Sequence, residues 1–159
     1  MASAQVALAT TTLGSAASTV TFGSIPGTYR DLRLVINGTV TTGGNIFIRF
    51  NGDSGNSYTY VQAYGTGSSA ASSTSSGSET ADASGVFYTN PGMAVYDFLD
   101  YSATDKHKSS LNRCSVAGNL VIMSAGRWAS TSAITSIVFS HGSGSYTSGT
   151  TFSLYGIVS

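Results

Sequence analysis

The chain has 159 residues, a formal net charge of +0 and only 9% charged residues, whereas about a quarter is usual for a globular domain. This length predicts a single domain, 1–159, with a substantial core. A neutral chain lacks the basic surface of a nucleic-acid-binding protein. No apolar run approaches the roughly 18 residues of a membrane-spanning helix. We therefore expect neither a nucleic acid nor a membrane as partner.

The single cysteine, Cys114, lies in an apolar run and excludes an intramolecular disulfide framework. The N-terminus lacks the positive region and the long apolar core of a signal peptide. These features predict a protein that is made in the cytoplasm and then stays soluble or joins an assembly. The 19 glycines and many Ser and Thr residues suit a weakly charged monomer or a protein packed against identical neighbours.

Alternating apolar residues predict strands along the first half of the chain. Residues 4–13 predict a strand within a segment, 1–17, that is a candidate N-terminal arm. A short strand is expected at 18–23 and a long one at 29–41. Residues 46–64 then predict a β-hairpin whose polar turn, 51–56, contains residues that tolerate tight backbone conformations.

The second half begins with residues 65–85, a low-complexity Gly/Ser-rich segment with no apolar side chain larger than Ala. Such a segment contributes little core, so we predict a long exposed loop. No helical period persists along the chain. Further strands are predicted at 86–88, 93–101, 113–125 with a break at Gly118-Asn119, 133–140 and 151–158. About 8–10 short antiparallel strands predict an all-β, jelly-roll-like β-sandwich.

Several segments, in their joint order, resemble a family of small structural proteins or modules of tailed bacteriophages, including phages of cyanobacteria and marine bacteria. They are 24–34 (SIPGTYRDLRL), 49–60 (RFNGDSGNSYTY) with 65–69 (GTGSS), 95–106 (VYDFLDYSATDK), 126–137 (GRWASTSAITSI) and 152–157 (FSLYGI). The resemblance implies a component of the virion, on the head surface or in the tail. It brings no catalytic motif with it.

Within that family we expect a head decoration (cement) protein, because the module begins close to the initiator Met and ends just after its last strand. The resemblance then implies binding to the major capsid protein, a homotrimer, and a place on the capsid surface of a virion assembled in the host cytoplasm. The protein would stabilise the shell by bridging capsid subunits. The alternative is a tail fibre, spike or minor tail protein whose β-sandwich binds a carbohydrate or receptor, such as a host surface glycan.

Aromatic residues supply the candidate binding sites. Tyr58, Tyr60 and Tyr64 share one parity of a predicted strand. They can line a sugar-binding face, or they can form cross-strand packing or a subunit interface, which we favour. Arg127 and Trp128 are residue types enriched at binding hot spots, and a core tryptophan beside a surface arginine is the alternative.

No metal or cofactor site is predicted. Asn51, Asp53 and Asn56 lack the repeated carboxylates and the closing glutamate of a calcium loop. Two lone histidines, His107 and His141, do not make a metal site. The sequence GTGSSA at 65–70 matches a dinucleotide-binding fingerprint only in its glycines, because no helix is expected after it.

No catalytic pair is predicted either. A polysaccharide hydrolase needs two carboxylates that face one cleft. Asp97 and Asp100 lie on opposite parities of one predicted strand and should point to opposite faces. We therefore expect a binding protein and no enzyme.

Overall fold

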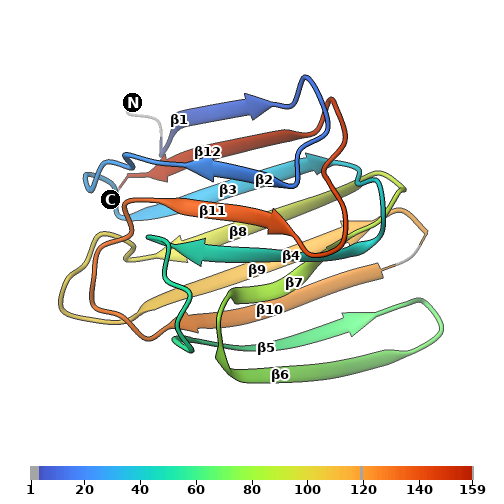
Figure 1. The fold of residues 1–159 in the computed structure, drawn as a ribbon. Helices are drawn as coiled ribbons and strands as arrows, with labels where there is room; N and C mark the ends of the chain where they lie inside the picture. The colour runs from blue at the N-terminus through green and yellow to red at the C-terminus, as the bar shows by residue number, and fades with distance from the viewer. Residues whose placement is uncertain (1–3, 119, 159) are drawn as a thin grey trace.

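The computed structural model describes residues 4–118 and 120–158, with only the backbone for 82–86. These residues form twelve strands in two sheets (Figure 1). The described part of the chain contains no helix with the length and hydropathy of a membrane span. The larger sheet contains, in spatial order, β1 (Gln5–Thr12), β12 (Thr151–Ile157), β3 (Asp31–Gly38), β8 (Gly92–Leu99), β9 (Lys108–Val116), β10 (Leu120–Trp128), β5 (Tyr58–Gly65) and β6 (Ala70–Ser78). The smaller sheet contains β2 (Thr19–Phe22), β11 (Ile137–His141), β4 (Gly44–Phe50) and β7 (Ala81–Phe87).

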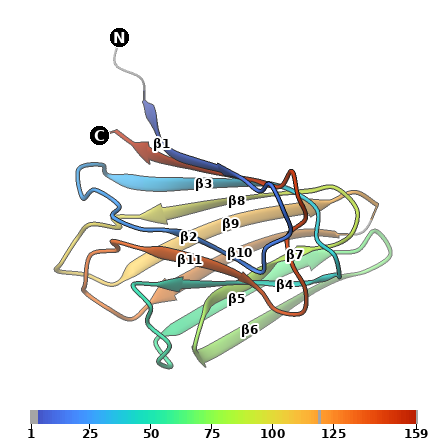
Figure 2. The same cartoon turned by 45° about the horizontal axis from the view of Figure 1, so that its top comes forward.

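Strand pairing follows the nested order of a jelly roll. β5 pairs with β6, β4 with β7, β3 with β8, β2 with β11 and β1 with β12, all antiparallel. The strands from β2 to β5 therefore alternate between the two sheets, which lie as two layers in Figure 2. β9 and β10 form a hairpin inserted between β8 and β5, and they widen the larger sheet. The predicted all-β, jelly-roll-like sandwich is confirmed.

The predicted hairpin at 46–64 is wrong. β4 pairs with β11 and β7, whereas β5 pairs with β10 and β6 in the other sheet. The polar residues between them cross from one sheet to the other. Alternation with period two reveals which face of a strand is buried, but it carries no information about the strand that lies beside it.

The long loop predicted at 65–85 is corrected as well. β6 and most of β7 occupy this segment, and β6 pairs with β5 along its whole length. β6 is largely exposed, as expected from its lack of large side chains. Strand pairing needs only backbone hydrogen bonds from a neighbour, so β5 can order a segment that adds nothing to the core.

The N-terminal segment is an edge strand rather than an arm. β1 confirms the strand predicted at 4–13, and it pairs with β12 of the same chain from Gln5↔Ile157 to Thr12↔Thr151. Residues 1–3 of the expected arm lie outside the described residues, as does Asn119 in the predicted break at Gly118-Asn119. The remaining predicted strands are present with shifted ends, and the strand predicted at 86–88 corresponds to the end of β7. The described chain has more strands than we expected, and β6 was not foreseen.

Side chains that point inward from both sheets form the core. Leu32, Leu34 and Ile36 of β3 are fully buried, as their shared parity predicts. Phe139 of the smaller sheet contacts Tyr96 of the larger sheet, with ring centroids 6.0 Å apart. The sandwich therefore buries one face of the larger sheet, and its other face remains available for binding.

Candidate docking face

The outward face of the larger sheet carries exposed apolar side chains on its inserted hairpin. Along β9 and β10, buried and exposed residues alternate almost without interruption, because successive side chains of a strand point to opposite faces. The inward residues pack in the core. Among the outward ones, Leu111, Val121 and Met123 expose 47%, 56% and 61% of their surface. Val61 on the neighbouring strand β5 exposes 59%.

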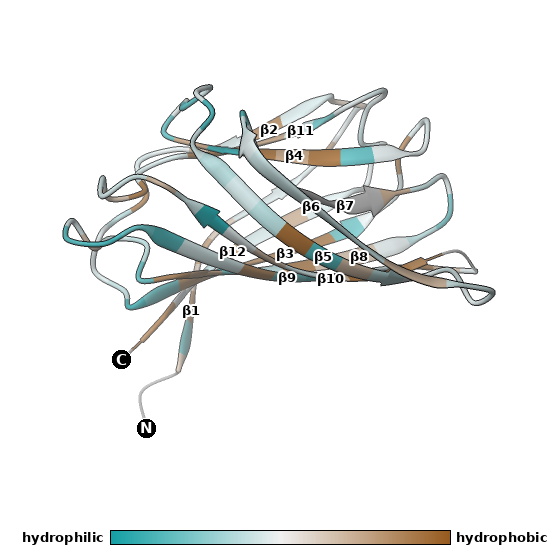
Figure 3. Ribbon diagram, turned by 90° about the horizontal axis from the view of Figure 1, so that it is seen from below, coloured by the Kyte–Doolittle hydropathy of each residue, from teal (hydrophilic) through white to brown (hydrophobic). Residues whose placement is uncertain are grey.

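The strand register places these side chains next to one another. Leu111 lies opposite Ala125, and Ala125 lies opposite Val61. Met123 occupies the next outward position of β10, and Val121 the one after it. We call the set Val61, Leu111, Val121 and Met123 the apolar band. Figure 3 shows hydrophobic stretches along the strands of this sheet.

The apolar band borders an open depression of about 520 Å³. Its lining comes from β5, β6, β8, β9 and β10, and it includes Val61, Leu111 and Met123. Asp97 and Arg113 add charged groups to the lining. The surface thus combines an apolar floor with a few polar groups, which is the usual composition of a protein-binding surface.

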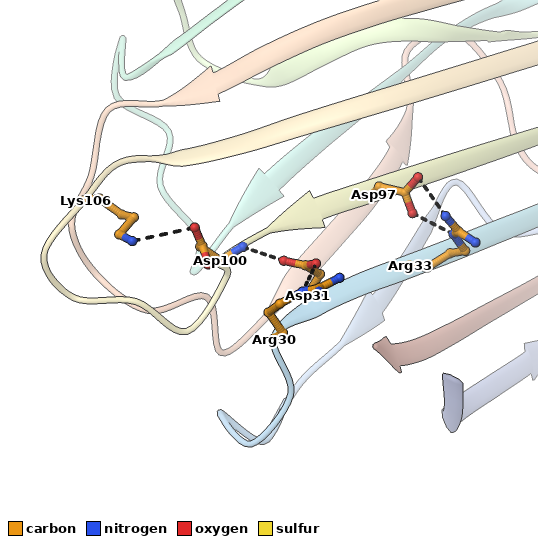
Figure 4. A network of polar contacts seen from close by, with 6 residues as sticks. All are labelled: Arg30, Asp31, Arg33, Asp97, Asp100 and Lys106. Atoms are coloured by element: carbon orange, nitrogen blue, oxygen red, sulfur yellow. Dashed lines mark hydrogen bonds and ion pairs between the residues drawn. The ribbon is translucent and has the colours of Figure 1, made fainter. Parts of the chain in front are cut away.

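A cross-strand ion pair joins Arg33 of β3 to Asp97 of β8 (Figure 4). Arg33 donates from Nε to Oδ1 of Asp97 at 2.6 Å and from Nη2 to Oδ2 at 3.1 Å. The hydrogen bond to Asp97 raises the pKa of Arg33. Asp97 is in turn the register partner of Leu111, so the ion pair and the apolar band share one row of the sheet.

Two further arginines on this face have no acidic partner among the described residues. Arg113 and Arg127 point outward from β9 and β10 and are exposed. The ion pairs within 4.0 Å in the described part of the chain involve other residues. The apolar band is therefore flanked by cationic side chains, and a surface with apolar and acidic groups would complement it.

A second polar network holds the end of this sheet. Asp31 at the start of β3 accepts a hydrogen bond from Nε of Arg30 at 2.7 Å and another from the backbone N–H of Asp100 at 2.9 Å (Figure 4). Nζ of Lys106 lies 3.6 Å from Oδ2 of Asp100. Asp100 follows β8 with a φ of 48°. These contacts join β3 to the connection between β8 and β9 and fix that end of the face.

Trp128 and Tyr58, two of the predicted binding residues, belong to the core. They expose 3% and 0% of their surface, and their rings stack with centroids 6.3 Å apart. Trp128 Nε1 donates to Oδ2 of Asp53 at 2.6 Å, and Tyr58 Oη donates to the carbonyl oxygen of Asp53 at 3.1 Å. The bond from Trp128 lowers the pKa of Asp53, and burial raises the pKa of Tyr58 to about 12. The pair anchors the crossing between β4 and β5.

The five predicted residues do not share one face. Tyr60 and Tyr64 lie opposite Gly126 and Ile122, which point inward, and both tyrosines are half-buried on that side. Arg127 is exposed on the outward side, beside the apolar band. The placement favours packing over a continuous sugar-binding face for the tyrosines. Sequence reasoning missed the apolar band, although residues 120–123 (LVIM) are apolar on both parities, which signals a strand with two apolar faces.

The other candidates lie apart from the apolar band. The described residues include no group of three or more His, Cys, Asp or Glu side chains placed to hold a metal ion. His107 is exposed between β8 and β9, and His141 at the end of β11 exposes 7% of its surface. Nδ1 of His141 accepts hydrogen bonds from the backbone N–H groups of Ser143 at 3.3 Å and Gly144 at 2.9 Å. His141 is therefore neutral, with its proton on Nε2.

This buried histidine predicts that stability falls as the pH drops below about 6.5. Burial lowers the pKa of His141 in the folded state. The unfolded chain then binds more protons than the folded chain below the ordinary histidine pKa, so the free energy of unfolding decreases with falling pH. Thermal unfolding at neutral and mildly acidic pH measures the effect. His141→Asn keeps an acceptor and removes the titration, so its pH dependence should be weaker.

The matched control is His107→Asn, because His107 is exposed and its loss leaves the buried group in place. This variant should show the pH dependence of the wild type. The same slope in all three proteins would contradict the role given to His141.

Comparison with known proteins yields similarity in fold alone. No protein-family model matches the chain, and no curated protein matches it. Alginate lyase Aly36B in complex with an alginate trisaccharide is 14% identical and aligns with 93% of this chain and 78% of its own, with a TM-score of 0.40. A complex of the same lyase with an alginate tetrasaccharide is 10% identical, covers 97% of this chain and 95% of its own, and has a TM-score of 0.36.

These comparisons correct one prediction. We expected the chain to be no enzyme, whereas solved structures of an alginate lyase resemble it. That expectation is contradicted and is not kept. At this level of similarity no activity, substrate or site residue is transferred from the lyases to this chain.

Proposed function

We propose that this chain is a structural protein of a tailed-bacteriophage virion that docks on the head surface through the apolar band and bridges neighbouring capsid subunits. The observation that supports docking is the band itself, in which four large apolar side chains expose between 47% and 61% of their surface on one sheet face. The phage assignment comes from the sequence resemblance, which names the major capsid protein as the partner.

The energetics of the apolar band suit attachment to a large assembly. Burying one large apolar side chain completely stabilises a complex by about 1.5–3 kcal/mol. Association costs about 4–15 kcal/mol in lost freedom and ordering. The four side chains of the band expose only 47–61% of their surface, so their burial offsets only the lower part of that cost. Stable binding then depends on further contacts around the band, or on contacts with two capsid subunits at once.

The charged residues on this face predict which groups the partner surface carries. Arg113 and Arg127 flank the apolar band and have no acidic partner among the described residues. A capsid surface that places an apolar patch opposite the band and acidic groups opposite these arginines would satisfy both.

Antibody labelling of intact particles of the phage that encodes this chain tests the assignment. We expect label distributed over the heads, with the tails free of it. Label confined to tail tips or fibres would contradict the head assignment and support the alternative tail protein that binds a host surface glycan. Particles without any label would contradict a virion component altogether.

A further inference from the structure

β6 is an edge strand of the larger sheet without the features that usually prevent an edge from pairing. Natural proteins protect edge strands with charged residues, proline, bulges or short length. β6 has nine residues, AASSTSSGS, with no charge and no proline. Its one register irregularity lies at the far end, where Gly77 has a φ of 65°. Residues 70–76 therefore form a regular open edge.

The other edges of the two sheets are less suited to pairing. The register of β1 is irregular between Ala7 and Ala9, in the middle of that strand. β2 has only four residues. The pairing of β7 with β4 is irregular between Ile46 and Ile48. Bulges and short strands are the devices that block edge-to-edge contact, so β6 is distinguished from the other three edges.

The binding groups of this edge are backbone atoms. An edge strand pairs through one side only, and alternate N–H and C=O groups point away from the sheet. Apart from the ladder with β5, no backbone–backbone hydrogen bond in the described part of the chain involves residues 70–78. Thr74 on this strand is exposed, and its Oγ1 donates to the carbonyl oxygen of Tyr60 within the same sheet. The small side chains permit close approach, and the backbone supplies the bonds.

We propose that β6 pairs with β6 of a second copy of this chain across a twofold axis at Thr74. The sequence around Thr74 is nearly symmetric, with Ser73 and Ser75 on either side and Ser72 and Ser76 beyond them. Antiparallel pairing about such an axis places each residue opposite its symmetric counterpart, so Thr faces Thr and Ser faces Ser. Facing Ser side chains hydrogen-bond across strands, whereas the Thr74 hydroxyl already donates to Tyr60. A twofold axis places the same surface of both copies in contact, so a charged side chain near the axis would face a like charge. β6 has no charged side chain, so this repulsion is absent.

The pairing would join the docking faces of the two copies. Thr74 is the register partner of Val61, and Val61 belongs to the row that includes Ala125 and Leu111. A twofold axis perpendicular to the sheet keeps the outward faces on the same side, so this row continues from one copy into the other. The inference goes beyond the proposed function and does not depend on it. It predicts a dimer, whereas the family resemblance implies a trimer.

Disulfide trapping of the purified chain tests the register. Thr74→Cys places the two new thiols opposite each other at the axis, where the Cα separation of paired strands, about 4.5–5.5 Å, matches that of a disulfide. We expect rapid formation of a covalent dimer on mild oxidation. The only native cysteine, Cys114, exposes 3% of its surface, so the wild type is the background control. Ser76→Cys on the same strand and Thr10→Cys on the β1 edge are matched controls and should crosslink slowly.

Sedimentation equilibrium of the unlinked proteins gives an independent test. The wild type should dimerise, and the double variant Ser72→Lys with Ser76→Lys should weaken the dimer at least about tenfold, because like charges then face each other across the seam. Both positions are exposed, so the melting temperature should change little. A monomeric wild type, an equally strong dimer of the double variant, or equal crosslinking of all three cysteine variants would overturn the proposal.

Discussion

Met123→Glu should weaken binding of the purified chain to phage heads that lack their own copy by at least about thirtyfold, and it should leave the fold intact. Met123 exposes 61% of its surface and lies within the apolar band. Docking would bury a carboxylate where the wild type buries a thioether, and the cost of desolvating the charge exceeds what its pairing with the neighbouring Arg113 returns. The loss at a central residue of an interface is typically at least about 2 kcal/mol, or roughly thirtyfold in affinity.

The fold should tolerate this change because of what lies next to residue 123. Arg113 is its register partner on β9 and has no acidic partner among the described residues. A glutamate opposite an arginine stabilises an antiparallel pair. Cosedimentation with the heads measures binding, and circular dichroism checks the fold. Ser153→Glu introduces the same charge on the same outward face, four strands away on β12, and should bind like the wild type. If Met123→Glu binds the heads as tightly as the wild type, the proposal that the chain docks through the apolar band is contradicted.

Trp128→Ala should lower the free energy of unfolding by about 3–5 kcal/mol, the usual loss for a large buried aromatic side chain. The indole contacts Phe50, with centroids 5.5 Å apart, and stacks on Tyr58. Its removal leaves a cavity between the sheets and deprives Oδ2 of Asp53 of the hydrogen bond from the indole. Urea unfolding measures the loss. Arg127→Ala, the neighbouring exposed residue, is the matched control and should stay within about 0.5 kcal/mol of the wild type.

A spectroscopic signature distinguishes this structural role from a general packing defect. The hydrogen bond from Trp128 is the largest cause of the lowered pKa of Asp53. Trp128→Ala should therefore raise that pKa toward its ordinary value, which an NMR titration of the Asp53 carboxyl can follow. The lowered pKa of Asp53 stabilises the folded wild type at pH values above the unfolded pKa of about 3.9. The difference in free energy of unfolding between the wild type and Trp128→Ala should therefore decrease as the pH falls below that value. An unchanged Asp53 titration would contradict the contact.

The sequence was sufficient to locate most strands and their buried faces. Val20 and Phe22 share one parity of β2, and Leu32, Leu34 and Ile36 share one parity of β3. All five are buried, because residues of one parity point to the same face of the sheet. Strand partners were not predictable in the same way. The segment 46–64 has the pattern of a hairpin, yet its two strands belong to different sheets, because the nested order of the jelly roll is decided by contacts far apart in sequence.

The candidate site was harder to predict than the fold. Tyr58 and Trp128 drew attention as binding residues because of their type, but both are buried and hold the crossing between the sheets. The apolar band depends on the register of β5, β9 and β10, which brings Val61 of one strand beside Leu111 of another. Residue type alone carries no information on that register. Of the residues singled out from the sequence, Arg127 alone lies exposed beside the band.

The most direct test of docking through the apolar band is a cryo-electron microscopy reconstruction of the intact phage head that resolves this chain. We predict that the outward face of β9 and β10 is turned toward the shell, with Leu111 and Met123 in contact with capsid protein. A chain on the head whose apolar band faces solvent would contradict the docking mode. Density for the chain only in the tail would contradict the proposed function itself.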